Sequence, residues 1–323
     1  MDCSNLNLSR LNGRLRSFFS KDQLLKVFLE DGYFWSGQGI RGQVCMQIAS
    51  RLGLEEDLAL DIATFTELLH NASLVHDDLI DEDVERRGHP TVWKRYGKSQ
   101  ALLVGDLLIA NSFMVATTSA APDSIRSKWA TSLSDTMSAT IRGANSELTF
   151  DFNNSNTLLA DYLEMAQNKT GSMFVLPIKC ICIALEMETK ETEQLCQAFS
   201  NMAVAYQIKD DQADYKGIKI GRTESSDANN GRPNIYHLLA CKDGNSEMNM
   251  DRINAVQQKL ILDAKELLKG FDLSLVQVLD ELVIPFVQLT SNLAPIESEA
   301  NFPDQYERQS SVSFQEDVVR SQV

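Results

Sequence analysis

Two short stretches of the chain carry three aspartates at the same spacing. They are "LVHDDLID" at 74–81 and "QIKDDQAD" at 207–214, and the aspartates are Asp77, Asp78 and Asp81 in the first and Asp210, Asp211 and Asp214 in the second. On a helix, residues three and four positions apart share a face. Carboxylates held so close raise one another's pKa, and a bound cation removes that conflict. Their hard oxygen atoms suit Mg²⁺, which usually bridges to substrate phosphates. We therefore expect all six to bind metal that holds a diphosphate.

Basic residues accompany both aspartate motifs. His70 lies two helical turns before Asp77, and the other basic residues are Arg86, Arg87, Lys169 in "NKTG" and Arg222 in "IGRT". Each alone reads as a surface charge, and one aspartate motif alone reads as a solvated helix end. Two such motifs with this set of cations favour a site for an anionic substrate.

Helices must position these residues. Gly and Pro are sparse, 16 and 7 of 323 residues, and apolar residues recur every three or four positions. The segment 57–81 is the clearest example, with Leu58, Ile62, Phe65, Leu69 and Ala72 along one face. Breaks fall at 36–42, 86–90, 119–124, 225–234 and 242–249. We expect one all-α domain over 1–295, followed by a polar, disordered tail over 296–323.

Composition excludes several classes of function. The net charge of −15 argues against a nucleic-acid partner. No apolar run approaches the ~18 residues of a transmembrane helix, and the six scattered cysteines favour a reducing, cytoplasmic location. The N-terminal segment, with Arg10, Arg14 and Arg16, reads as a solvated first helix, with an organelle-targeting segment as the alternative.

Taken together, the motifs resemble those of the trans-isoprenyl diphosphate synthases and the related class I terpene cyclases. The resemblance covers about residues 30 to 240 and is carried by "GQGIR", "LLHNASLVHDDLIDEDVERRGHPT", "ALLVGD", "NKTG" and "YQIKDDQADYKG". It implies the all-α isoprenoid-synthase helical bundle, with two aspartate motifs facing each other across a deep cavity. It also implies three Mg²⁺ ions that bridge the motifs to an allylic diphosphate, and a homodimer formed through helices that flank the first motif.

The resemblance assigns roles to individual positions. The six aspartates match the two metal motifs, and Gln207 matches the glutamine just before the second motif. The residues that match those gripping the allylic diphosphate are Arg86, Lys169 and Arg222. Three further residues match those holding isopentenyl diphosphate, the second substrate, and they are Arg41, His70 and Arg87.

Several positions depart from the pattern of chain-elongating relatives. Gln38 stands where those enzymes have a lysine, Gly39 replaces an arginine, Gly42 replaces a proline, and Ala144 replaces a glutamine. The segment "GRPN" at 231–234 replaces a usual Gly-Lys-x-Thr. Each lost charge-assisted bond is worth about 1.5–3 kcal/mol. We therefore expect a weakened isopentenyl diphosphate site beside an intact allylic site.

Two activities follow from this comparison, and the first expectation is a class I terpene cyclase. It would be a lyase that ionises farnesyl diphosphate and closes the cation on its own double bonds. Aromatic faces would stabilise the positive charge, and the candidates are Phe65, Phe150, Phe174 and Tyr206.

The alternative activity is prenyl transfer to isopentenyl diphosphate, which would make farnesyl or geranylgeranyl diphosphate. The small residues Ala72 and Ser73 before the first motif favour geranylgeranyl diphosphate. A non-catalytic partner subunit is the third possibility, but such a subunit has no need for six metal-binding carboxylates.

Overall fold

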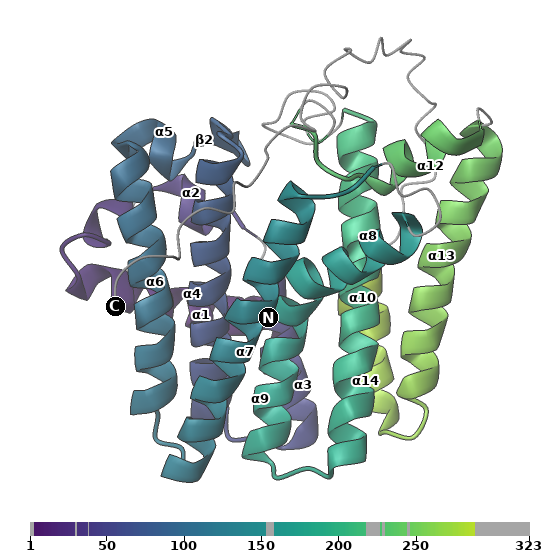
Figure 1. The fold of residues 1–323 in the computed structure, drawn as a ribbon. Coiled ribbons are helices and arrows are strands. Elements are labelled where there is room, and N and C mark those ends of the chain that lie inside the picture. Colours follow the sequence, from purple (N-terminus) through teal and green to yellow (C-terminus); the bar gives the residue numbers. More distant parts are fainter. Residues whose placement is uncertain are drawn as a thin grey trace, which may run out of the picture. The chain divides into compact units, whose positions relative to one another are not determined.

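The computed structural model describes residues 3–29, 31–37, 39–152, 158–217, 227, 230–243 and 246–287 (Figure 1). Over these residues nearly all regular structure is helical, which confirms the all-α prediction. A two-stranded antiparallel hairpin, β1 (Glu85–Arg86) and β2 (His89–Pro90), is the one sheet in this part of the chain.

The helices follow one another with short connections. Their bounds are α1 Cys3–Lys21, α2 Gly32–Trp35, α3 Ile40–Leu52, α4 Glu56–Ile80, α5 Val92–Tyr96, α6 Lys98–Thr118, α7 Asp123–Leu148, α8 Leu158–Ala166, α9 Ser172–Ala184, α10 Thr189–Tyr215, α12 Ile235–Asp243, α13 Ser246–Leu267, α14 Leu273–Val278 and α15 Ile284–Val287. A 3₁₀ turn spans Lys26–Phe28, and π-helical turns span Gln167–Gly171 and Leu279–Val283.

Helix α4 carries the first aspartate motif, and its bounds agree with the helix predicted over 57–81. Glu56 and Asp57 in its first turn favour the helix because they face the positive end of the helix dipole. The predicted apolar face is buried at Ile62, Phe65, Leu69 and Ala72, against neighbours that include α3 and α6. This packing brings the motif to the C-terminal end of α4.

Helix α10 carries the second motif in the same way. Its middle packs into the main core through residues such as Phe199 and Met202. Its C-terminal part contributes Val204 and Ile208 to a smaller apolar cluster with residues of α8, α12 and α13. The C-terminal ends of α4 and α10 therefore lie at the same end of the helices (Figure 1).

The N-terminal arginines are engaged with the rest of the fold. Leu11, Leu15 and Phe19 of α1 are buried in the main core. Arg14 forms an ion pair with Asp61 of α4 at 2.8 Å, and Arg10 pairs with Glu56. This packing favours the interpretation of the segment as the first helix of the fold.

Helix α6 is the one described helix that is long and apolar enough, by composition, to cross a membrane. It contacts α4, α5 and α7, as a core helix of a helical bundle does. The compact unit that holds all the described helices spans Met1–Thr290. The predicted tail at 296–323 lies outside the described residues, so the predicted domain boundary stays a prediction.

Candidate active site

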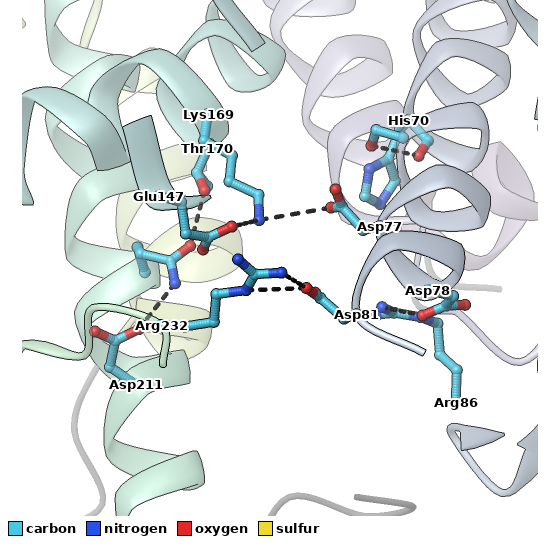
Figure 2. A network of polar contacts seen from close by, with 12 residues as sticks. His70, Asp77, Asp78, Asp81, Arg86, Glu147, Lys169, Thr170, Asp211 and Arg232 are labelled. Atoms are coloured by element: carbon cyan, nitrogen blue, oxygen red, sulfur yellow. Dashed lines mark hydrogen bonds and ion pairs between the residues drawn. The ribbon is translucent and has the colours of Figure 1, made fainter. Parts of the chain in front are cut away.

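The three aspartates of the first motif point in different directions. Asp77 and Asp81 face Lys169 and Arg232, which belong to the part of the fold that carries α10 (Figure 2). Asp78 points away from them and is buried, with 1 % of its side chain exposed, compared with 25 % for Asp77. The two adjacent aspartates therefore have different surroundings.

Asp78 is held by two donors from distant parts of the chain. The Tyr33 hydroxyl donates to its Oδ2 at 2.6 Å, and Nε of Arg86 donates to its Oδ1 at 2.8 Å. Asp31 caps the N-terminus of α2 by accepting the backbone N–H of Tyr33 at 3.0 Å, which fixes the tyrosine. Burial and the charge of Asp78 raise the pKa of Tyr33, so its hydroxyl stays a donor.

The β1–β2 hairpin directs two consecutive arginines to two sites. Its two loop residues, Arg87 and Gly88, both have positive φ, 55° and 81°, as the tightest hairpin turns require. Arg86 reaches back to Asp78, while the guanidinium of Arg87 lies against Gly37, where an added methyl group would collide with it. We predicted a chain break at 86–90; the break is this hairpin.

Two ion pairs connect the first motif to the opposite side of the site. Nε of Arg232 donates to Oδ1 of Asp81 at 3.0 Å. The ammonium of Lys169 lies 3.8 Å from Oδ2 of Asp77 and 2.5 Å from Oε2 of Glu147 on α7. Sequence reasoning did not assign a role to Arg232 or Glu147, although Arg232 stands in the "GRPN" segment that marked a departure from the family pattern.

In the second motif, Asp211 is enclosed by three donors. They are the Tyr162 hydroxyl at 2.8 Å, Nε2 of Gln207 at 2.9 Å and the backbone N–H of Ile235 at 2.9 Å. Burial raises the pKa of Asp211, and these hydrogen bonds oppose that shift. Asp214 is also buried and accepts the backbone N–H of Asp227 at 3.2 Å.

Gln207 connects the second motif to the π-helical turn at Gln167–Gly171. Thr170 donates to Oε1 of Gln207 at 2.8 Å, and Gln207 donates in turn to Asp211. The same turn presents Lys169 to the first motif. π-Helical turns are frequent at functional sites because they displace side chains from the regular helical positions.

A cavity of about 390 Å³ lies beside the first motif. Three predicted residues line it together, namely Arg41, His70 and Arg87, and Glu67 and Tyr206 add to its wall. Nη1 of Arg41 lies 3.0 Å from Nε2 of His70. Because a guanidinium has no acceptor, that imidazole nitrogen must be unprotonated. Burial, together with the nearby cation Arg41, lowers the pKa of His70 well below its usual range, so the ring is neutral.

Glu67 compensates for the charge of Arg41, which is deeply buried. Its Oε1 accepts the backbone N–H of Gly42 at 2.8 Å, in the first turn of α3. Burial raises the pKa of Glu67, and the charge of Arg41 opposes this shift. Sequence reasoning missed Glu67, because its partner residues precede it by about a helix and a loop.

Two predicted positions lie outside the described residues, namely Arg222 and Gln38. The aromatic candidates occupy different environments. Phe65 is fully buried against Trp129, and Phe150 packs on Phe152. Phe174 lies under the Arg41 guanidinium at 4.4 Å, and Tyr206 lines the cavity. The expectation that Phe65 contacts a substrate is wrong, because its ring is part of the core.

The donor set of the motifs fits a hard divalent metal. Asp77 and Asp81 are partly exposed carboxylates that face the opposite side of the site, and Mg²⁺ prefers such oxygen ligands together with phosphate and water. Across the described ranges, no three acidic, histidine or cysteine side chains form a ready-made metal cluster.

Comparison with known proteins places this site in a family. The Polyprenyl synthetase family model matches residues 22–269. A short chain isoprenyl diphosphate synthase from Methanocaldococcus jannaschii is 30 % identical over 240 residues, which are 73 % of this chain and 72 % of that protein. Other curated relatives are named farnesyl, geranylgeranyl and octaprenyl diphosphate synthases.

Solved structures share the fold. The geranylgeranyl pyrophosphate synthetase from the archaeon Geoglobus acetivorans aligns with a TM-score of 0.74 and 22 % identity, over 86 % of this chain and 98 % of that chain. A geranyltransferase from Helicobacter pylori, complexed with magnesium and isoprenyl diphosphate, aligns with a TM-score of 0.70 and 20 % identity, over 88 % and 98 % of the two chains.

These comparisons correct the first expectation of function. The curated relatives are named as prenyl diphosphate synthases, so the expected terpene cyclase, a lyase, is wrong and the alternative is favoured. The cyclase expectation gave too much weight to Gln38 and Gly39, although Arg41, His70 and Arg87 still line one cavity. The family match over most of the chain and the 30 % identical relative agree with the two aspartate motifs and the helical fold, and the chain belongs to the polyprenyl synthetase family.

Proposed function

We propose that this protein is a prenyl diphosphate synthase that joins an allylic diphosphate to isopentenyl diphosphate. The bond between the allylic carbon and oxygen breaks, and diphosphate leaves. The double bond of isopentenyl diphosphate attacks the allylic carbon, and the new cation loses a proton. The observation that carries the proposal is the cavity lined by Arg41, His70 and Arg87, directly beside the first aspartate motif.

The proposed allylic side uses the residues around the two motifs. Asp77, Asp81 and Asp210 would hold the divalent metal, with Mg²⁺ as the first choice because a structural relative is complexed with it. The metal, when bound, neutralises the diphosphate leaving group. Lys169 and Arg232 supply two further positive charges close to Asp77 and Asp81. Asp78, Asp211 and Asp214 are buried, and their hydrogen bonds favour a role in holding the motifs in place.

The proposed isopentenyl diphosphate side depends on fixed positive charge. Arg87 extends from the hairpin turn toward the cavity, and Arg41 is held by His70, Glu67 and the ring of Phe174. Since His70 is neutral, it orients Arg41 without competing for the negative charge of the substrate.

The length of the product follows from the residues before the first motif. Ala72 is buried and small, and the Ser73 hydroxyl donates to the backbone carbonyl of His70 at 2.8 Å. Neither side chain projects as a bulky stop below the metal motif. We therefore propose geranylgeranyl diphosphate as the main product.

The proposal extends to assembly and location. Helix α6 leaves Leu102, Leu103 and Met114 exposed, at 50, 54 and 44 %. An exposed apolar stripe of this kind indicates a protein interface, and a second copy of the chain is the proposed partner. The four cysteines whose side chains the structure describes are free thiols, which supports a reducing, cytoplasmic location.

The release of diphosphate tests the proposed reaction. Purified protein with Mg²⁺ and an allylic diphosphate should release diphosphate only after isopentenyl diphosphate is added. Replacing Arg87→Gln should raise KM for isopentenyl diphosphate by about ten-fold or more and change KM for the allylic substrate little. The exposed Arg142→Gln on α7 is the matched control. Equal release with the allylic substrate alone would contradict the proposal.

A further inference from the structure

The ammonium group of Lys169 lies between two carboxylates from different helices. Oε2 of Glu147 on α7 is 2.5 Å away, and Oδ2 of Asp77 on α4 is 3.8 Å away (Figure 2). All three side chains are at least three-quarters buried, with 16 to 25 % of each exposed. The contact with Glu147 is therefore much the closer, although Asp77 is within reach.

The backbone fixes Glu147 at this position. Gly143 lies one turn earlier on the same face of α7, and an added Cβ there would lie only 2.8 Å from Cα of Lys169. The glycine thus allows α7 to contact the backbone of the π-helical turn directly. The next residue on that face, Glu147, then meets the end of the Lys169 side chain.

Lys169 keeps its charge in this environment. Burial disfavours the ammonium form, but the negative charges of Asp77 and Glu147 outweigh burial and raise the pKa of Lys169. The lysine therefore remains a cation that competes with any other cation for Asp77. Its long flexible side chain can move between the two carboxylates.

We propose that Glu147 is a positioning residue that keeps Lys169 off Asp77, so that Asp77 remains open to a divalent metal. This inference rests on the proposed function, in which Asp77 binds metal. Without the Glu147 charge, Asp77 becomes the one carboxylate in the structure's printed ion pairs left to Lys169. The ammonium would then form a direct pair with Asp77, and a metal would have to displace it.

Metal binding without substrate tests the proposal. We would titrate Mn²⁺ alone into the full-length protein and follow free Mn²⁺ by electron paramagnetic resonance. Glu147→Gln should weaken Mn²⁺ binding on the order of ten-fold, as expected for one new charge-assisted contact at Asp77. Glu164→Gln, the same charge change at an exposed position of α8, should change it by less than about two-fold.

A second lysine-free background separates positioning from direct ligation. In Lys169→Met protein, adding Glu147→Gln should change Mn²⁺ affinity by less than about three-fold, because no ammonium remains to be restrained. A loss as large as in the wild-type background would show that Glu147 acts on the metal itself and would overturn the proposal. So would unchanged affinity in the single Glu147→Gln variant.

Two further variants guard against other failures. Glu147→Asp keeps the charge, so it should retain more Mn²⁺ affinity than Glu147→Gln even if both lose some stability; equal loss would favour a merely structural role and contradict the inference. Asp77→Asn should abolish the tightest site. Unchanged Mn²⁺ binding in that variant would overturn the metal assignment of the proposed function, whereas its loss together with an unaffected Glu147→Gln would overturn this inference alone.

Discussion

At the scale of single residues, adjacent aspartates divide their tasks. Asp77 is partly exposed and faces Lys169, whereas Asp78 is buried and accepts hydrogen bonds from Tyr33 and Arg86. Removing one partner from a buried, paired carboxylate leaves an uncompensated charge, which costs about 3–5 kcal/mol. The carboxylate oxygens of Asp78 are therefore committed to the fold.

Arg232 is the residue that sequence reasoning left unassigned at the centre of the site. It is paired with Asp81, 13 % exposed, and faces the same space as Lys169. We predict that Arg232→Gln raises KM for the allylic diphosphate by ten- to a hundred-fold, because one charge-assisted contact is lost. Steady-state kinetics with each substrate varied in turn would measure this. An increase confined to isopentenyl diphosphate would place Arg232 in the other subsite.

The neutral state of His70 predicts a pH effect on stability. Its pKa is lowered in the folded protein, whereas the unfolded chain has a pKa of about 6.5. Between these values the unfolded state binds the extra proton, so stability falls as the pH falls below about 6.5. From pH 7.5 to 5.5 the wild type should lose about 1 kcal/mol more than His70→Gln, whose amide still accepts from Arg41. Urea unfolding at both pH values measures the difference. Shifts from buried carboxylates such as Glu67 occur in both proteins and cancel, and identical pH dependence would refute a neutral His70.

The sequence allowed the aspartates and most of their cations to be predicted, because these lie in short contiguous motifs. It also contained a signal for Asp78 and Asp211 that was not used. Each lies one helical turn after a buried residue, Val75 and Ile208, so each belongs to the inward face. Tyr33, Glu67 and Glu147 could not be predicted, because their partners are brought close only by helix packing.

At the scale of elements, the contact between α7 and the π-helical turn determines where Lys169 lies. Gly143 permits that contact, since a side chain there would meet the backbone of Asn168 and Lys169. Backbone atoms cannot move aside as a flexible side chain can. The turn also carries Thr170, which bonds Gln207 of α10, so any displacement reaches the second motif.

We predict that Gly143→Ala lowers stability by about 1–3 kcal/mol, as overpacking does in a close-packed interior, and also lowers kcat. The matched control is Gly13→Ala in α1, where nothing lies within 4 Å of the added methyl group. That change should stabilise the helix by up to about 1 kcal/mol. Thermal unfolding and kinetics of both variants measure the contrast. Equal stability of the two variants would contradict the close approach.

The elements themselves followed from the sequence to different degrees. Helix α4 was predicted nearly to its ends, because its apolar period is regular over many turns. The β1–β2 hairpin was predicted as a simple break, because two-residue strands leave no period to detect. Its direction of Arg86 and Arg87 to separate sites depends on the positive φ of Arg87, an uncommon conformation for a residue other than glycine.

At the scale of the whole molecule, the exposed apolar side of α6 predicts a homodimer. Leu103→Glu should convert the protein from a dimer to a monomer of 36.1 kDa while preserving its helical content. Leu262→Glu on α13 makes the same change at another exposed leucine, 63 % exposed, and should leave the dimer intact. Sedimentation at micromolar concentration measures both. A wild-type monomer would refute the α6 interface.

The function depends on the whole arrangement, because the two motifs and the adjacent cavity come from segments far apart in the chain. Sequence departures such as Gln38 and Gly39 favoured cyclisation when taken singly. The cavity residues and the relatives favour elongation. The central claim is therefore that isopentenyl diphosphate is consumed as a substrate.

The mass of the product tests that claim most directly. Purified protein would be incubated with Mg²⁺, farnesyl diphosphate and ¹³C-labelled isopentenyl diphosphate, and the products analysed by mass spectrometry without removal of phosphate. We predict geranylgeranyl diphosphate that carries the label of one isopentenyl unit and retains its diphosphate, and we predict no product when either substrate or the metal is omitted. An unlabelled product formed from farnesyl diphosphate alone would contradict the account.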